Sequence, residues 1–384
     1  MDALANFTPE QLAQTPAGVP PPGVVPNLKN PHSDGYVLIT VGTTLMAIMF
    51  LFLAMRFYAK FLILRKLTPD DYTTICAVIG TCLYYFVCVY GVTKAKFATH
   101  MWDISIAHTM SDEFLIPSFF LNWPTALVWA FAKTSFFLMY LDLFSPVKWL
   151  RIGCYVGIIV NWGFYIAVIA ASLYYNAPSP GQTWLEGSQN PRYAGSFNMT
   201  MPIASGSLIL DVYILLLPVW VVWNLHLNLT RRLGVIAIFA TGLFCCVASS
   251  LSIVYKHKLN GKLGDFTWWT YPILLMALVE MCVGISASCM PATAAFWRHV
   301  FGQSSENPTG RSLWASRIFM PIRSLVRSKG SSHYSKNSSG SSWPGSHHIY
   351  KSSHVDVQVD NESTRHLAHD HEMMAFGGNQ SKLV

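Results

Sequence analysis

Seven apolar stretches, each of roughly 20 residues, the length of a membrane-spanning helix, run through this chain. They fall at about 36–55, 72–92, 119–141, 153–173, 203–223, 233–254 and 269–290. A helix rises about 1.5 Å per residue, so each stretch crosses the roughly 30 Å hydrocarbon core of a bilayer. The stretches are too long for barrel strands and lack the alternation of such strands. The sequence therefore predicts an all-α, polytopic membrane protein, a seven-transmembrane helix bundle.

The composition agrees with a lipid environment. The chain is 52% hydrophobic and only 12% charged, whereas about a quarter of the residues of a soluble domain are charged. The formal net charge is +7, and the excess lies largely in the predicted loops and tail. Such a distribution favours contact with an anionic cytoplasmic leaflet over a nucleic-acid site. The expected partner is the lipid bilayer, and no nucleic acid is expected.

The flanking segments differ from the core in composition. Residues 1–35 form a polar, Pro-rich segment that is predicted to be extracellular, and they lack the regions of a cleavable signal peptide. The first span is therefore expected to serve as the targeting signal. Residues 292–329 read as a basic juxtamembrane segment, and residues 330–384 as a disordered, Ser/His-rich cytoplasmic tail. The core of seven helices is expected between them, over residues 36–291.

The third apolar stretch begins near Phe114 and contains Pro117 and Pro124. Proline removes a backbone donor and clashes with the preceding turn of a helix. We therefore expect the outer end of this span to be bent or partly outside the core.

The orientation follows from the charges near the span ends. An odd number of spans places the two termini on opposite sides, and the loop lysines and arginines are evenly split between the sides. Arg56, Arg298 and Arg311 tip the balance toward an outer N-terminus and a cytoplasmic C-terminus. The plasma membrane is the expected location. Asn6 begins an Asn-Phe-Thr sequon on the predicted outer side and is a glycosylation candidate.

Three ionisable residues lie inside odd-numbered spans: Lys133 in the third, Asp211 in the fifth and Glu280 in the seventh. Counted from the outer ends, Asp211 lies about 12 Å deep, Glu280 about 16 Å and Lys133 about 21 Å. Intramembrane charges are costly and usually paired or functional. The functional interpretation is an intramembrane charge network that serves as a ligand counter-ion, an ion site or a switch. The alternative is an ion pair that only holds helices together.

The second span begins with Thr68, Pro69, Asp70 and Asp71. Thr68 suits an N-cap, Pro69 suits the first helical position, and acids in the first turn face the positive end of the helix dipole. This capping interpretation explains Asp70 and Asp71, and an acidic patch facing a cytoplasmic partner is the alternative.

Further cytoplasmic-face candidates are Asp142 at the end of the third span and Arg231 with Arg232 before the sixth. Asp142 is expected to form a surface ion pair or, as in some receptors, a latch. The basic residues of the inner loops with which Asp142 could pair are Arg65, Lys148 and Arg151.

Several kinds of site have no matching pattern in the sequence. The seventh span contains no lysine, so the Schiff base that light-driven rhodopsins form with retinal is not expected. No histidine lies deep in a span, and the sequence shows no nucleophile–base set or phosphate loop. We therefore expect that the protein is not an enzyme and that it has no catalytic residues, no metal site and no cofactor. The tail histidines are only a weak metal signal: His347, His348, His366, His369 and His371.

The ordered set of short motifs resembles the fungal rhodopsin-domain family of seven-helix membrane proteins. The resemblance covers about residues 36–291 and is carried by the set as a whole. Its parts are Arg56-Phe57-Tyr58, Asp70-Asp71, Lys133-Thr134-Ser135, Tyr140 to Phe144, Asp211 with Pro218, Trp223-Asn224-Leu225, Arg231-Arg232, Gly242, Glu280 and Cys289-Met290-Pro291.

Two features depart from the family pattern. Asp142 stands where the family segment carries a basic residue, which weakens any basic latch implied by the resemblance. The loop from Tyr175 to Met201 contains none of the cysteines often found there, so an outer disulfide is not expected. The Cys-rich extracellular domain of some members is also not expected here, and the family name does not imply retinal.

The resemblance implies a receptor-like membrane protein. In that interpretation an outer cavity binds an unknown small ligand and biases the Lys133, Asp211 and Glu280 network between two states. The inner loops and tail would contact a signalling partner, with a heterotrimeric G protein as the candidate. The alternative is a seven-helix transporter or channel for a small solute. It is suggested by the similarity of two short segments, Asn122-Trp123-Pro124 in the third span and Thr270-Tyr271-Pro272 in the seventh, because transporters of this kind contain internal repeats.

Overall fold

A computed structural model describes residues 7–144, 147–224, 229–261 and 263–302 of the chain. For residues 220–224, 229–238, 260–261, 263, 298 and 301–302 it describes the backbone alone. The tail predicted to be disordered, most of the predicted juxtamembrane segment and Asn6 lie outside the described residues.

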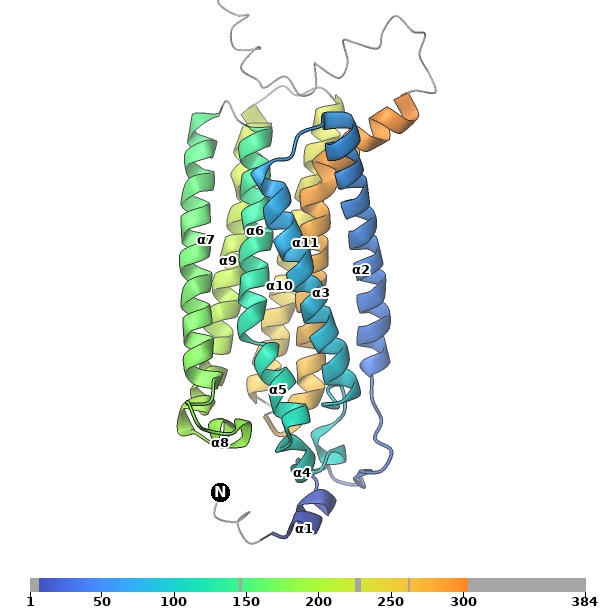
Figure 1. Cartoon of the computed structure of the whole chain (residues 1–384), viewed down its shortest axis with the longest axis vertical. Coiled ribbons are helices and arrows are strands. Elements are labelled where there is room, and N and C mark those ends of the chain that lie inside the picture. Colours follow the sequence, from blue (N-terminus) through green and yellow to red (C-terminus); the bar gives the residue numbers. More distant parts are fainter. Residues whose placement is uncertain (1–6, 145–146, 225–228, 262, 303–384) are drawn as a thin grey trace, which may run out of the picture. The chain divides into compact units, whose positions relative to one another are not determined.

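Seven helical segments are long and apolar enough to cross a membrane, by length and composition, in the described part of the chain. Figure 1 shows them running alongside one another as a bundle. They are α2 (Gly35–Tyr58), α3 (Pro69–Thr93), the pair α5 (Asp112–Phe120) and α6 (Trp123–Leu143), α7 (Lys148–Asn176), α9 (Gly195–Asn224), α10 (Leu229–Gly261) and α11 (Phe266–Gly302). The predicted all-α, seven-helix membrane fold is confirmed.

The first and last helices extend beyond the apolar stretches that predict them. After α2 the chain continues through a π-helical turn, Ala59–Leu64, before it reaches α3. Helix α11 passes through Pro291 and ends at Gly302. Membrane helices tolerate proline where neighbouring helices or side chains satisfy the freed carbonyl groups. The Met290-Pro291 pair, which reads as an end in the sequence, is therefore internal to the helix.

The third span is interrupted between α5 and α6, as the two prolines predict. Pro117 lies inside α5, and Pro124 lies in the first turn of α6. Between them, the backbone N–H of Leu121 donates to the carbonyl of Pro117 at 2.9 Å. Pro124 has no N–H to continue the ladder of α5, so a new helix begins here with its own first turn. The expected bend is confirmed.

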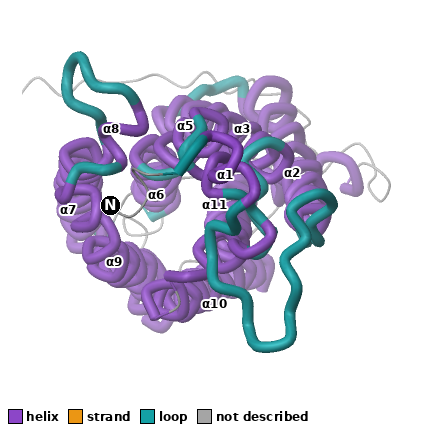
Figure 2. The backbone as a smooth tube through the Cα atoms, turned by 90° about the horizontal axis from the view of Figure 1, so that it is seen from below, coloured by secondary structure: helices purple, strands orange, loops and turns teal. Residues whose placement is uncertain are grey.

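The helices pack in a closed order that is visible end-on in Figure 2. Contacts join α2 to α11, α11 to α10, α10 to α9, α9 to α7, α7 to α6, α6 to α3 and α3 back to α2. Helix α11 is the most enclosed of the spans. Of the 18 residues that form its most apolar part, 67% are buried inside the bundle, whereas the corresponding share is 22% for the first and fourth spans. Three clusters of buried apolar side chains fill the interior, and α6 contributes to all of them. Residues on α6 and α11 are therefore placed to meet in the centre.

The outward faces of the spans are apolar. Side chains such as Phe86 (68% exposed), Ile159 (72% exposed) and Ile209 (68% exposed) have no protein neighbour to cover them. In water such a surface would be costly and prone to association, whereas lipid tails cover it. The chain is accordingly a multi-pass membrane protein that sits in a lipid bilayer.

Two ends of the bundle can be told apart, and we name them by their structure. The loop-rich end carries residues 7–34, 94–111, 177–194 and 263–265, with the short helices α1 (Pro9–Gln14), α4 (Ile106–Thr109) and α8 (Trp184–Ser188), at the bottom of Figure 1. The opposite end, where α2 ends and α3 begins, is the Arg56 end.

At the loop-rich end, residues 7–34 and 94–111 form a layer that we call the cap. Isolated antiparallel bridges join Pro16 to Ser105 and Ser33 to Thr99. The backbone N–H of Asn27 donates to Asp103 at 2.8 Å. The cap is fixed to the helix bundle where the N–H of Ala98 donates to the carbonyl of Thr267, at the start of α11, at 3.2 Å.

Candidate functional site

The three intramembrane charges meet in the centre of the bundle. Lys133 on α6 forms an ion pair with Asp211 on α9, and its Nζ lies 3.7 Å from Oε1 of Glu280 on α11. The side chains of these residues are only 5%, 9% and 9% exposed. The sequence left open which acid would pair with Lys133, and in the structure both acids face the same ammonium group. We call these residues the triad.

Neighbouring polar groups hold two members of the triad more firmly than the third. Lys133 Nζ donates to the carbonyl of Ser207 at 3.0 Å and contacts its hydroxyl at 3.2 Å. The hydroxyl of Ser249, on α10, donates to Asp211 Oδ2 at 2.8 Å. Oε1 of Glu280, by contrast, has no hydrogen-bond partner among the described residues, although the hydroxyl of Ser249 also stabilises the Glu280 carboxylate. Asp211 is therefore the fixed partner of Lys133, and Glu280 is the loosely held one.

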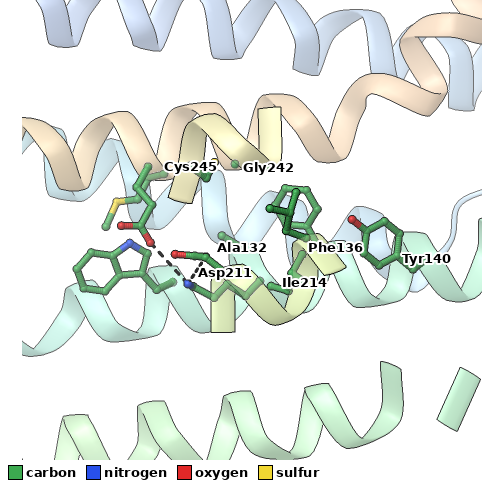
Figure 3. A pocket seen from close by; sticks show the side chains of 13 residues that line it. Ala132, Phe136, Tyr140, Asp211, Ile214, Gly242 and Cys245 are labelled. Atoms are coloured by element: carbon green, nitrogen blue, oxygen red, sulfur yellow. Dashed lines mark hydrogen bonds and ion pairs between the residues drawn. The ribbon is translucent and has the colours of Figure 1, made fainter. Parts of the chain in front are cut away.

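A small cavity of about 30 Å³ adjoins the triad. Figure 3 shows Asp211 beside it, with the apolar residues that line it toward the Arg56 end: Phe136, Tyr140, Ile214 and Gly242. The cavity is polar mainly where the triad faces it, and its size is sufficient for a water molecule or two at that side. The triad thus has a compartment into which a loosely held carboxylate can move, or in which water can reach it.

A larger cavity of about 170 Å³, the main cavity, lies toward the loop-rich end. Its lining comes from α3, α5, α6, α7, α9, α10 and α11. Among the described residues that line it, Lys256 on α10 is the one that carries a charge. Cavities of this kind, mostly apolar with a few polar groups and enclosed between helices, are typical ligand sites.

Trp129 connects the two cavities, because its side chain lines both. It lies one helical turn before Lys133 on α6. Its ring stacks on Tyr165, with centroids 6.3 Å apart, and the Tyr165 hydroxyl lies 3.0 Å from the Ser207 hydroxyl that contacts Lys133. A group that moved Trp129 from the side of the main cavity would therefore disturb the surroundings of the triad.

Helix α10 provides a second connection. Ser249 contacts Asp211 of the triad, and Ser252 and Lys256 line the main cavity. Residues spaced by three and four along a helix share one face. One face of α10 thus carries contacts to both sites, so a rotation or shift of this helix affects them together.

A second buried cluster of charges lies at the Arg56 end. Nε and Nη2 of Arg56 donate to Asp71 Oδ1 at 2.9 and 2.8 Å, and Nη2 contacts Asp70 Oδ2 at 2.5 Å. Nη1 of the same residue donates to the carbonyl of Ser288 on α11 at 2.7 Å. Lys60 Nζ completes the cluster at 3.3 Å from Asp71 Oδ2. With two cations and two acids, the cluster is neutral and ties α2, α3 and α11 together.

One acid of this cluster, Asp71, also caps helix α3. Asp71 accepts a hydrogen bond from the N–H of Thr68 at 2.8 Å and forms a capping box with it. Asp70 and Asp71 are only 4% and 1% exposed. The capping interpretation thus describes the local structure, and the burial leaves no exposed acidic patch at these positions.

The remaining sequence candidates do not join either cluster. Asp142 is exposed near the end of α6, within electrostatic range of Lys60 and Lys66. Arg231 and Arg232 lie near the start of α10, and their side chains are outside the described residues, as is Asn6. All eight cysteines are free.

Sequence patterns alone do not assign several residues to these sites, among them Arg56, Lys60, Tyr165, Ser207 and Ser249. Arg56 is an orientation marker and part of a family motif in the sequence, and an arginine at the end of a span, followed across a short turn by two acids, is itself a signal of an ion pair. The serines and Tyr165 carried no such signal. Hydroxyl side chains are common in membrane helices, and only the rotation of each helix shows which of them face the triad.

Comparisons with known proteins agree with this architecture. The family model of the fungal rhodopsin domain matches residues 55–299. A SAT4 family membrane protein of Emericella nidulans is 31% identical over 178 residues, which cover 45% of this chain and 43% of that protein. The fugralins biosynthesis cluster protein 2 of Gibberella zeae is 24% identical over 288 residues, or 72% of this chain and 69% of that protein.

The match to the Emericella protein thus spans less than half the length of that relative. No solved structure matches the chain. The family match covers well over half of the chain and includes the triad, the residues around both cavities and the cluster at the Arg56 end. On these grounds the chain belongs to the fungal rhodopsin-domain family of membrane proteins.

Proposed function

We propose that this protein is a receptor-like membrane protein without retinal, in which a small ligand in the main cavity shifts the triad between two arrangements. The observation that supports this most directly is the shared wall at Trp129, which lines both the main cavity and the small cavity at the triad. An occupant of the main cavity contacts this wall and the face of α10 that reaches Asp211. A ligand shifts such an equilibrium only by its difference in affinity for the two states.

The loose contact to Glu280 suggests what the two states are. In the described structure the ammonium group of Lys133 is paired with Asp211, and Glu280 Oε1 lies at 3.7 Å without a donor. In the second state, Lys133 would pair fully with Glu280 and release Asp211 to Ser249. Helices α6, α9, α10 and α11 carry these groups, so the exchange would change how they pack toward the Arg56 end.

In this proposal the loop-rich end faces the outside and the Arg56 end faces the cytoplasm, in the plasma membrane. The cytoplasmic loops and the C-terminal segment would then contact the signalling partner, for which a heterotrimeric G protein is our candidate. The supporting argument is the charge balance near the span ends, where Arg56, Arg298 and Arg311 mark the cytoplasmic side.

Two paired variants test ligand binding in the main cavity. Ala171 lines this cavity, and Ala170, its neighbour on α7, is exposed on the lipid-facing side. A library of small molecules is screened against the purified protein in nanodiscs by thermal unfolding, and hits are tested for nucleotide exchange on a co-reconstituted G protein. We expect Ala171→Trp to abolish binding of the hits and Ala170→Trp to leave it intact. Equal behaviour of the two variants would place the ligand elsewhere.

The switch is tested at Lys133. Lys133→Met leaves two acids without a cation, so the double variant Lys133→Met with Asp211→Asn restores part of the charge balance and protects folding. We expect either variant to bind hits but to lose the ligand-dependent change in nucleotide exchange. Full expression with a full response in both variants would refute the triad mechanism.

Transport of a small solute receives less support from the structure. The similarity of Asn-Trp-Pro in the third span to Thr-Tyr-Pro in the seventh would suggest that both helices are interrupted at corresponding positions of an internal repeat. The third span is interrupted before Pro124, but α11 continues without a break through Pro272. Both prolines also lie near the loop-rich end, within a few turns of the start of their helices, and not near the triad. Solute flux in proteoliposomes without any partner would favour transport.

A further inference from the structure

We propose that the main cavity binds a small carboxylic acid with an aromatic or short apolar body, and that Lys256 and Ser252 hold its carboxylate. This inference rests on the ligand-binding function proposed above and specifies the chemical class of the ligand. It follows from the state of the polar groups in the cavity wall and from the size of the cavity.

Lys256 faces the cavity without a counter-ion. It lines the cavity wall, and among the described residues no hydrogen bond or ion pair joins its ammonium group. The acid that acts on it electrostatically is Glu280, which belongs to the triad and does not line the main cavity. An ammonium group within a membrane helix is costly unless it is paired or reaches water. An anionic ligand in the cavity would provide the missing partner.

Ser252 offers a second donor at the same place. It lies one turn from Lys256 on α10, so both side chains share one face of the helix, and both line the main cavity. Ser252 is 8% exposed, and its hydroxyl has no hydrogen-bond partner among the described residues. A hydroxyl and an ammonium group one turn apart match the two oxygens of a carboxylate.

Several of the other hydroxyl groups in the cavity wall are already engaged. Ser118, Thr125 and Thr270 each donate to a backbone carbonyl one turn earlier in the chain, at 2.7, 2.8 and 2.7 Å. Such back-bonded hydroxyls have no proton left for a ligand. Other donors also face the cavity, among them the hydroxyl groups of Ser172 on α7 and Ser196 on α9. Lys256 is the charged group in the described wall, and this places the anionic group of the ligand beside α10.

The remaining wall is largely aromatic and apolar. Its larger side chains are Tyr84, Phe97, Trp129, Phe197, Phe266 and Leu274. The volume is about 170 Å³, and a dry cavity of about 150 Å³ in another protein is known to hold benzene. A single ring or a short alkyl chain with one carboxylate therefore fits, whereas a nucleotide or a peptide does not.

The test compares acids with neutral molecules of the same shape. Benzoate and hexanoate are measured against benzamide and hexanamide by isothermal titration calorimetry, with the full chain in nanodiscs. A hydrogen bond to a charged group contributes enough for a preference of about tenfold to a hundredfold. We expect benzoate to bind more tightly than benzamide by that factor.

Variants assign this preference to Lys256. Lys256→Met is expected to weaken benzoate binding by about tenfold to a hundredfold and to leave benzamide binding unchanged, which also shows that the variant is folded. Lys256→Arg should retain most of the preference. Lys258→Met is the matched control, because Lys258 lies over the rings of Tyr255 and Trp269, at 5.8 and 5.4 Å, and does not line the cavity.

The outcomes separate this inference from the proposed function. Equal binding of acids and amides, or equal effects of Lys256→Met and Lys258→Met, would overturn the carboxylic-acid assignment. If Ala171→Trp still blocked the neutral molecules, the cavity would remain a ligand site and the proposed function would survive. If no probe bound, the assignment would fall, and the library screen would decide the proposed function independently.

Discussion

Replacing Arg56 by methionine removes a guanidinium group that joins helix α2 to α3 and α11 at the Arg56 end. The group makes four contacts: two with Asp71, at 2.9 and 2.8 Å, one with Asp70 at 2.5 Å and one with the carbonyl of Ser288 at 2.7 Å. Charged hydrogen bonds contribute about 1.5–3 kcal/mol each, but methionine also avoids the cost of burying a charge. Removal of one partner from a buried pair typically costs about 3–5 kcal/mol, and we expect a loss of that size in the free energy of unfolding.

The reasoning also predicts a coupling between Arg56 and Asp70. In the Arg56→Met protein one cation, Lys60, remains for two buried acids, so the cluster carries a net negative charge. Asp70→Asn in that background restores neutrality, because Lys60 still lies 3.3 Å from Asp71. The second substitution should therefore cost less than it does alone, with a coupling energy of about 1–3 kcal/mol.

The assay is reversible unfolding by sodium dodecyl sulfate in mixed micelles, followed by circular dichroism. Lys66→Met is the control, since Lys66 is an exposed cation close to the same turn, and we expect it to change stability by no more than about 0.5 kcal/mol. A loss below about 1 kcal/mol for Arg56→Met, or strict additivity of the two substitutions, would refute the view that this cluster stabilises the bundle.

Three further predictions concern other parts of the molecule. Ser249→Ala removes the hydroxyl donor from Asp211 and should lower the free energy of unfolding by about 1–3 kcal/mol in the same assay. Gly157→Ala would place a Cβ 2.4 Å from a ring carbon of Phe137, so it should cost about 1–3 kcal/mol through overpacking, measured by thermal unfolding. Burial lowers the pKa of His108 below its ordinary value of 6.5, so the folded state favours the neutral ring. Stability should fall as the pH drops from 7 through about 6.5 toward the lowered value, and His108→Gln should flatten this dependence.

The sequence predicts the fold well because lipid leaves few alternatives. A span must be an apolar helix of sufficient length, so each helix can be recognised without knowledge of its neighbours. The interruption between α5 and α6 follows in the same way from Pro117 and Pro124. The ends are harder to predict. Helix α11 continues past Met290 to Gly302, because a packed membrane helix tolerates Pro291 and the segment after it, Ala-Thr-Ala-Ala-Phe-Trp, is largely apolar and contains good helix formers.

The site is only partly readable from the sequence. Lys133, Asp211 and Glu280 stand out because charges are rare in spans, and a depth count places them at similar levels. The count cannot show that Asp211 is the close partner and Glu280 the distant one, since this depends on the rotation of each helix about its axis. The same holds for Lys256, which reads as a loop lysine in the sequence but lines the main cavity. Asp71 has two roles, as a cap and as a partner of Arg56, and sequence patterns predict only the local one.

The cap at the loop-rich end has a consequence for the rate at which molecules exchange with the main cavity. Phe97 from the cap and Phe266 from the start of α11 are part of the cavity wall. The cap is held there by isolated bridges and hydrogen bonds, among them two to Asp265, and by the buried ring of Phe97. These contacts must open locally before the main cavity is reached from this end. An occupant entering from this end must wait for such an opening. Its association rate would then follow the opening frequency of the cap, and ligands of very different affinity would enter at similar rates.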